Sequence, residues 1–230
     1  MRTIGLIGGM SWESSAEYYR LINQQVRERL GRLRSAQLLM YSVDFGPVEQ
    51  AQHAGRWDDA AAILVDGARR LEAGGAECVV LCTNTMHKVA EQIQAAISIP
   101  FLHIAEPAAQ AALEIDARTV GLLGTAFTME QDFLKQRLIA QGLTVLVPDD
   151  AERKEVHRII YDELCVGVIS GQSREIYQGV IESLTARGAQ AIILGCTEIG
   201  LLIKPEHSVL PLLDTTELHA QSAVAFALGD

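Results

Sequence analysis

Short apolar runs recur along the chain, and most of them show no alternation of apolar with polar residues. Val, Ile and Leu dominate these runs, which lie at residues 3–8, 36–43, 77–82, 100–104, 119–124, 143–147, 190–195 and 208–213. Unbroken apolar runs of this length are typical of parallel strands that are buried on both faces of a sheet. The pattern therefore predicts a strand at each of these places.

Longer amphipathic segments separate the runs. In residues 18–30 and 176–184, apolar side chains recur at the spacing of one helix face. Helix starts are predicted at two box-like pairs, Ser14 with Glu17 and Thr128 with Gln131, and helix ends at Gly74 and Gly188. Strands and helices alternate throughout, which indicates the α/β class with mostly parallel sheet.

The chain contains a near-repeat of itself. Three segments of the first half return in the second at almost constant spacing: Arg2–Gly8 as Arg118–Gly124, Gly75–Thr83 as Gly188–Cys196, and Pro100–His103 as Pro211–Asp214. In the second pair, Thr83 stands opposite Cys196, and each follows an apolar strand. The two residues are therefore expected to occupy equivalent places in two similar halves.

The repeat predicts two pseudo-symmetric α/β domains. Each is expected to hold a mostly parallel four-stranded sheet flanked by helices, with the active site in the cleft between the domains. We expect the first domain to comprise residues 1–103 plus about 214–230, and the second to comprise about 104–213. Ligands of such sheets bind outside the carboxyl ends of the strands.

Composition narrows the classes of partner. A formal net charge of −10 disfavours nucleic acid, because that affinity depends on clustered Lys and Arg. No apolar stretch approaches the length of a membrane span. The 4 cysteines show no CxxC spacing and the chain gives no secretory signal, so they are expected to be reduced thiols of a cytoplasmic protein. A small-molecule substrate is the partner that remains.

The sequence lacks the motifs of several common classes of enzyme. The Gly8-Gly9 pair is no G-x-G-x-x-G fingerprint, so it reads equally well as cleft lining or as a tight turn, and no G-x-S-x-G elbow is present. The histidines show no zinc spacing, and no lysine ends a clear buried strand, where a Schiff-base amine would be expected. We therefore expect no cofactor and no metal.

Two segments combine a strand end, small polar residues and a following helix: Cys82–His87 and Gly195–Glu198. A helix N-terminus can hold a carboxylate and lower the pKa of a thiol placed there. Cys196 is therefore the candidate reactive thiol, whereas Cys78 and Cys165 are expected to be small core residues.

The other candidates in these segments are weaker. Strand side chains alternate, so Cys82 should point away from whatever Thr83 faces. His53 and His87 could be acid or base groups, although a surface or structurally satisfied histidine is the commoner case.

These motifs resemble those of the aspartate/glutamate racemase family of cofactor-independent amino-acid racemases. The resemblance rests on Cys82-Thr83-Asn84-Thr85, Gly195-Cys196-Thr197-Glu198 and the opening Ile7-Gly8-Gly9-Met10, and it covers essentially the whole chain. It implies two pseudo-symmetric α/β domains, often as a homodimer. It also implies a cysteine from each domain beside the substrate α-carbon, one removing a proton and the other returning one on the opposite face.

Residue by residue, the resemblance gives Cys196 the role of the second-domain cysteine. Asn84, Thr85 and Thr197 match positions that hold the substrate carboxylate or amino group. The expected substrate-binding residues are Met10, Gln52, Asn84, Thr85, Thr125, Thr197 and Glu198.

The chain departs from the family pattern in two respects. The usual first motif is Cys-Asn-Thr, but here Thr83 replaces the cysteine. Because a hydroxyl is a poor base near neutral pH, we expect Cys196 to abstract and Thr83, or a water that it holds, to donate. Residues 43–55 contain no Arg or Lys, and Cys165 falls where acid-specific members have a lysine, so a neutral or mixed substrate range is compatible with the sequence.

Two other interpretations stay open. A single-cysteine relative of the same superfamily could be a decarboxylase or a cis-trans isomerase of small carboxylic acids, since one thiol suffices for one-sided protonation. A catalytically weakened amino-acid-binding protein would bind in the same place and exchange no α-proton. Solvent deuterium at the α-carbon without loss of carbon dioxide would separate a racemase from both.

Overall fold

The computed structural model describes residues 1–230, in which strands and helices alternate along the chain. The strands are β1 (Ile4–Gly8), β2 (Leu38–Ser42), β3 (Cys78–Leu81), β4 (Phe101–Leu102), β5 (Thr119–Gly124), β6 (Thr144–Leu146), β7 (Ala191–Gly195) and β8 (Leu212–Asp214). The α-helices are α1 (Trp12–Leu30), α2 (Phe45–His53), α3 (Trp57–Ala73), α4 (Ala90–Ala95), α5 (Ala105–Glu114), α6 (Ala126–Glu130), α7 (Asp132–Ala140), α8 (Asp150–Asp162), α9 (Gly171–Ala186), α10 (Ile199–Leu202) and α11 (Thr215–Leu228). Short 3₁₀ segments are η1 (Thr85–Val89), η2 (Leu164–Val166) and η3 (Pro205–His207).

The chain forms two compact units. Unit 1 contains Met1–His103 and His219–Asp230, and unit 2 contains Ile104–Leu218. Each unit has a parallel four-stranded sheet, with strand order β2-β1-β3-β4 in unit 1 and β6-β5-β7-β8 in unit 2. The two orders are equivalent position by position, so the predicted α/β class with a duplicated four-stranded sheet is confirmed.

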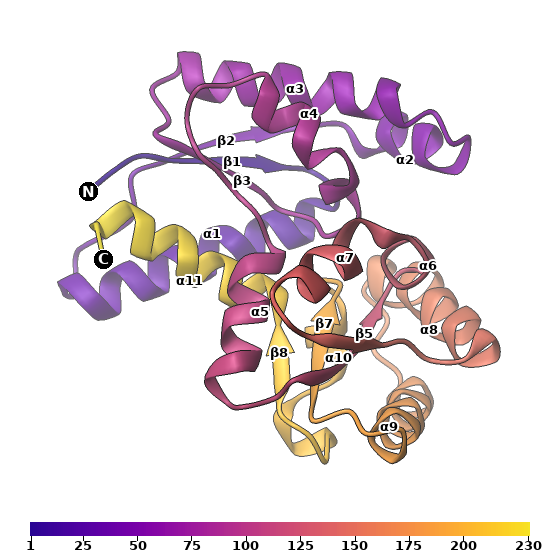
Figure 1. Ribbon diagram of the computed structural model, residues 1–230. Helices are drawn as coiled ribbons and strands as arrows, with labels where there is room; N and C mark the ends of the chain where they lie inside the picture. Colours follow the sequence, from indigo (N-terminus) through magenta and orange to yellow (C-terminus); the bar gives the residue numbers. More distant parts are fainter. The chain divides into compact units, whose positions relative to one another are not determined.

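The sheet of unit 1 lies between two helical layers (Figure 1). Ile4 and Leu6 of β1 face the layer of α1 and α11, where Tyr18 is fully buried. Ile7, the next residue on the strand, faces the opposite layer and packs in one cluster with Leu64 of α3. This alternation along a strand that is apolar throughout gives the unit a core on each face of the sheet.

Unit 2 repeats the arrangement around its own sheet. Val120 and Leu122 of β5 pack with the apolar face of α5 and α7. Leu123 belongs to the opposite core, which α8 and α9 cover. The expectation of strands buried on both faces is correct for the central strands β1, β3, β5 and β7 but not for the edge strand β2, whose residues are half-buried or exposed. None of the helices combines the length and apolarity that a membrane span requires.

The predicted helix starts are three residues late. Ser11 caps α1 and accepts a hydrogen bond from the Ser14 backbone N–H, and Thr125 caps α6 and accepts from that of Thr128. The expected capping boxes at Ser14 and Thr128 are therefore wrong, because the hydroxyl nearest the strand end already satisfies the free N–H groups. The helix end at Gly74 is correct, since Gly74 is the C-cap of α3.

Candidate functional site

In unit 1, the carboxyl ends of β1 and β3 meet at one edge of the sheet. The Cys82 backbone N–H donates to the Ile7 carbonyl at 2.9 Å, so the segments that follow both strands start side by side. A Cβ on Gly9, whose φ is +98°, would lie 2.2 Å from the Val43 carbonyl oxygen. The Gly9 N–H donates to Ser15 Oγ at 2.7 Å. Gly8-Gly9 therefore forms a tight strand-to-helix turn, as one of its two interpretations predicted.

At the end of β3, the adjacent residues Cys82 and Thr83 lie in different surroundings. Cys82 is fully buried among Ile4 and Tyr18 in the core on the α1 side of the sheet. Burial raises the pKa of its thiol far above the usual range. Thr83 is half-buried, and its backbone N–H donates to the Leu81 carbonyl at 2.9 Å. Cys82 thus points into the core, as the alternation predicted, and its thiol is held in the protonated form.

The remaining predicted residues of unit 1 lie close to this edge. Asn84 and Thr85 follow Thr83 directly and are 4% and 7% exposed. Gln52 on α2 is buried, and its Nε2 lies 2.8 Å from Met86 Sδ, while Met10 packs in the same cluster as Met86. The side-chain oxygen of Gln52, Oε1, has no protein partner. Met10 and Gln52 therefore both belong to the part of unit 1 whose core contains Met86.

In unit 2, two glycines allow the corresponding strand ends to approach closely. Gly124 of β5 pairs with Gly195 of β7. A Cβ on Gly195 would lie 2.9 Å from the Leu123 carbonyl oxygen, and one on Gly124 would lie 2.9 Å from the Gly195 carbonyl oxygen. Thr125 and Cys196 follow these glycines, so both leave the same edge of the sheet of unit 2.

Cys196 is part of a short polar chain at this edge. Its Sγ donates a hydrogen bond to Glu198 Oε2 at 3.1 Å, and Thr197 Oγ1 donates to the same oxygen at 2.5 Å. Cys196 and Glu198 are 9% and 7% exposed. One buried carboxylate therefore accepts from both a thiol and a hydroxyl, which places a proton acceptor against the sulfur.

The environment of Cys196 raises the pKa of its thiol well above the usual value. Burial is the main cause, and the charge of the Glu198 carboxylate adds to it. The expectation of a thiol pKa lowered by a helix N-terminus is therefore wrong. The following helix, α10, is only 4 residues long, so its dipole is small, and a carboxylate lies next to the sulfur.

The other two cysteines differ from each other. Cys78 is a core residue, as predicted, and burial raises the pKa of its thiol to about 12. Cys165 is half-buried and packs against the edge of the cluster that contains Cys196, so the prediction of a core position is correct only in part.

The two candidate histidines lie in contrasting surroundings. His53 is exposed at the end of α2, and its Nε2 lies 3.1 Å from Glu49 Oε1. His87 is 3% exposed, and its Nδ1 lies 2.8 Å from the Thr83 carbonyl oxygen. The sequence does not signal the buried rings that contact His87, because His103 and His219 are distant from it along the chain.

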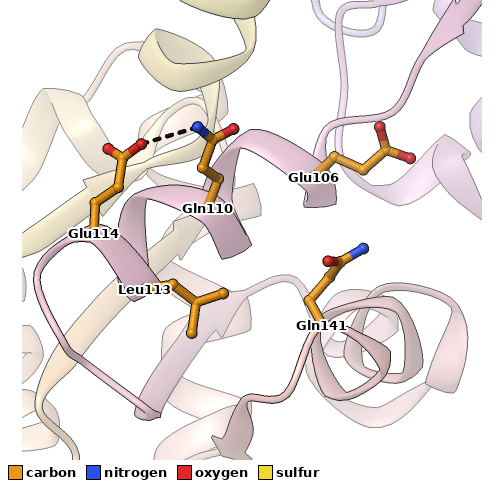
Figure 2. A pocket seen from close by; sticks show the side chains of 5 residues that line it. All are labelled: Glu106, Gln110, Leu113, Glu114 and Gln141. Atoms are coloured by element: carbon orange, nitrogen blue, oxygen red, sulfur yellow. Dashed lines mark hydrogen bonds between the residues drawn. The ribbon is translucent and has the colours of Figure 1, made fainter.

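A surface hollow elsewhere on unit 2 contains none of the predicted residues (Figure 2). It is lined by Glu106, Gln110, Leu113, Glu114 and Gln141. Its carboxylates are engaged at the surface, since Gln110 Nε2 donates to Glu114 Oε1 at 2.9 Å and Glu106 lies 3.8 Å from Arg137. No three His, Cys, Asp or Glu side chains are grouped as metal ligands. The strand end with Thr83 in unit 1 and the strand end with Cys196 in unit 2 therefore remain the candidates.

Comparison with known proteins shows similarity along most of the chain. A family profile described as Asp/Glu/Hydantoin racemase matches residues 7–223. A candidate Asp/Glu racemase from Yersinia pestis shares 51% sequence identity, with a TM-score of 0.94 over 99% of this chain and 100% of that one. An aspartate racemase homologue from Pyrococcus horikoshii OT3 is 33% identical, with a TM-score of 0.87 over 99% of this chain and 100% of the other.

More distant relatives extend the comparison. The broad specificity amino-acid racemase of Bacillus subtilis is 26% identical over 75% of this chain and 74% of its own length. A variant of arylmalonate decarboxylase shares the fold, with 15% identity and a TM-score of 0.61 over 100% of this chain and 94% of that one.

Proposed function

Because the chain belongs to the Asp/Glu/Hydantoin racemase family, we propose that it is a cofactor-independent racemase of α-amino acids with Cys196 as its base. The observation that carries this proposal is the 3.1 Å hydrogen bond from the Cys196 thiol to the Glu198 carboxylate. A thiol becomes a base only after it has lost its own proton, and Glu198 is the group in place to receive that proton.

The first half of the reaction takes place at Cys196. The thiol proton moves to Glu198 Oε2, and the sulfur lone pair then takes the α-proton of the substrate. The electron pair of the broken C–H bond stays on the substrate, delocalised into its carboxylate. The raised pKa of Cys196 makes its thiolate a stronger base than an ordinary thiolate, which suits the weakly acidic α-proton.

The second half takes place at Thr83. Its hydroxyl gives a proton to the opposite face of the α-carbon, and the resulting alkoxide recovers a proton from water. The proton that Glu198 received neutralises the hydroxide, so Glu198 returns to its carboxylate form. An alkoxide is much harder to form as a starting base than a thiolate. The two directions are therefore unequal, with faster reaction for the enantiomer whose α-proton faces Cys196.

The neighbouring polar residues hold the substrate. Asn84, Thr85 and Thr197 donate to its carboxylate or accept from its amino group. The buried Gln52 Oε1 accepts from the substrate ammonium, because a buried amide oxygen without a partner costs about 1–3 kcal/mol that a bound cation recovers. Met10 and Thr125 complete the proposed set of substrate contacts.

The proposed substrates are α-amino acids as a class. Residues 43–55 hold no Arg or Lys that could pair with a second carboxylate. The similarity to a broad specificity racemase supports a range that includes neutral side chains, whereas the similarity to a candidate Asp/Glu racemase supports acidic ones. Both kinds of amino acid therefore belong in the test.

The test is exchange of the α-proton with solvent. Both enantiomers of aspartate, glutamate and the common neutral amino acids are incubated with the protein in heavy water, and α-deuterium and enantiomer ratio are followed by NMR and chiral chromatography. We expect deuterium incorporation with inversion for at least one pair, abolished in Cys196→Ala. Full exchange in Cys196→Ala would refute the proposal.

Cys82→Ala is the matched control for the neighbouring thiol. Because Cys82 lies in the core and its thiol is held protonated, this variant should keep the parent exchange rate with a modest loss of stability. Loss of exchange in Cys82→Ala would assign the base to that cysteine instead. Release of carbon dioxide without inversion would point to the single-thiol decarboxylase alternative.

A further inference from the structure

Unit 1 contains a cluster of buried aromatic rings, one of which is hydrogen-bonded to the Thr83 backbone. His87, His103 and His219 are 3%, 3% and 0% exposed. The His87 ring centroid lies 4.6 Å from that of His103 and 5.8 Å from that of His219, both edge to face. Tyr18 adjoins His219 with a centroid distance of 5.7 Å. None of these rings is used by the proposed reaction, yet four buried polar rings in contact are an unusual core.

Hydrogen bonds of the cluster fix which nitrogen carries the proton in His219 and in His87. His219 Nε2 lies 2.8 Å from the Leu102 carbonyl oxygen, which can only accept, so this nitrogen carries the proton. Nδ1 of the same ring then accepts from the Tyr18 hydroxyl at 2.9 Å. By the same reasoning, His87 Nδ1 carries a proton and donates it to the Thr83 carbonyl oxygen at 2.8 Å.

The Thr83 carbonyl is available to His87 because the chain winds tightly after Thr83. In an α-helix this carbonyl would accept from the backbone N–H of residue 87. Here that N–H donates to the Asn84 carbonyl at 3.0 Å, in the 3₁₀ pattern of η1. The His87 side chain takes the place of its own backbone as donor, and so links Thr83 to the buried cluster.

We propose that His87 is a positioning residue, which fixes the backbone of Thr83 and thereby the direction of its hydroxyl. This inference rests on the proposed function, since it concerns the acid of that reaction. Proton transfer depends steeply on geometry, and displacement of a reacting group by about 1 Å can lower a rate by about 100-fold. The packed rings of His103 and His219 hold His87 in one orientation, so its bond supports Thr83 from a rigid core.

Two amide variants separate the hydrogen bond from simple filling of space. In His87→Asn, the amide nitrogen can occupy the place of Nδ1 and keep the bond to the Thr83 carbonyl. In His87→Gln, the amide lies one carbon further out, at the place of Nε2, and the bond is lost. We expect His87→Asn to invert the substrate within about threefold of the parent, and His87→Gln to do so about 10- to 100-fold more slowly with little change in KM.

A second readout separates positioning of Thr83 from general damage. Cys196 acts before Thr83, so His87→Gln should still exchange the α-proton of the enantiomer that faces Cys196, with retention of configuration. Equal inversion rates in His87→Asn and His87→Gln would overturn the inference, as would a parallel loss of exchange and inversion. Tyr18→Phe, which removes a hydroxyl from the same cluster but no bond to Thr83, should invert at the parent rate.

Failure of the proposed function would look different. A parent protein that exchanges no α-proton, or a Cys196→Ala variant that exchanges fully, removes the proposed function and this inference together. A parent that inverts in a manner dependent on Cys196, with His87→Gln equal to it, removes only the role of His87.

Discussion

The burial of Cys196 and the neighbouring Glu198 carboxylate together determine the acidity of the Cys196 thiol. A thiol beside a carboxylate carries a raised pKa, which lowers the fraction of thiolate at neutral pH but makes each thiolate a stronger base. In the proposed reaction, Glu198 offsets the first effect by receiving the thiol proton. The pair of Cys196 and Glu198 is therefore better suited than a permanently ionised thiolate to remove a proton from a weakly acidic carbon.

Replacement of Glu198 by Gln tests whether the carboxylate must accept the proton of the Cys196 thiol. The amide can still accept the hydrogen bond from Cys196 Sγ but cannot take its proton. We expect Glu198→Gln to lower kcat by about 100- to 10,000-fold, with a smaller change in KM. The rate should rise steeply with pH in the variant, because hydroxide must then remove the thiol proton. Steady-state kinetics between pH 6 and about 10 measures both effects.

Glu206→Gln is the charge-matched control. Glu206 is exposed on η3 in the same unit and contacts neither Cys196 nor Thr197 through any hydrogen bond. Its substitution removes the same formal charge and should leave kcat and the pH profile at the parent values. A similar loss in both variants would show that long-range charge, and not the proton acceptor, governs the rate.

The sequence could identify residues of the candidate site but not their electrostatics. Alternation along β3 was sufficient to predict that Cys82 points away from Thr83, because the side-chain period of a strand is fixed. The sign of the pKa shift of Cys196 was mispredicted. That sign depends on burial and on the direction of the Glu198 side chain, and neither is written in the spacing of Gly195–Glu198.

At the scale of elements, the contact between β5 and β7 depends on glycine. The added Cβ of Gly195→Ala would meet the Leu123 carbonyl oxygen at 2.9 Å and Leu122 Cδ1 at 3.0 Å. Since the first of these is a backbone atom, the strands must separate. We expect Gly195→Ala to lower the free energy of unfolding by about 1–3 kcal/mol, measured as a lower urea midpoint followed by circular dichroism.

Gly179→Ala provides the contrast in the same unit. Gly179 lies within α9, and a Cβ there meets nothing within 4 Å. Alanine at an open helical position should raise the stability by about 0.5–1 kcal/mol. A midpoint for Gly195→Ala at or above that of the parent would show that the strand ends can relax around a methyl group.

The positions of strands and helices were predictable where a single local feature of the sequence determines them. The central strands follow directly from runs of apolar residues, which must be buried on both faces. The edge strand β8 begins at Leu212, later than the apolar run at 208–213, because strand pairing and not apolarity sets where a strand begins. Helix starts were misplaced since several hydroxyls near Ser11 compete for the cap, and only the geometry of the strand end selects one.

At the scale of the whole molecule, the duplication explains the order of both sheets, but the ends of the chain break its symmetry. Residues His219–Asp230, which include most of α11, belong to unit 1, where Ala220 and Ala223 pack in one cluster with Tyr18. The Arg2 backbone N–H donates to the Ala227 carbonyl at 2.8 Å. Unit 1 is thus assembled from both ends of the sequence, and its stability depends on the last helix.

His219 makes that dependence sensitive to pH. Burial lowers the pKa of His219 from 6.5 to about 4. The unfolded chain therefore takes up a proton near pH 6.5, whereas the folded protein resists it until about pH 4. Between these values the unfolded state binds more protons, so the contribution of His219 is complete above pH 6.5 and is lost progressively as the pH falls towards 4.

The variant His219→Gln isolates this contribution. An amide can donate to the Leu102 carbonyl in place of Nε2 but does not titrate near neutral pH. All other titratable groups, including His87, His103 and Tyr18, are common to both proteins, so their effects cancel in the difference. On acidification from pH 7 to 4, the parent should lose up to about 3 kcal/mol of unfolding free energy relative to the variant, measured from urea midpoints. A difference that stays constant over this range would mean that the ring gains a proton without leaving its place in the core.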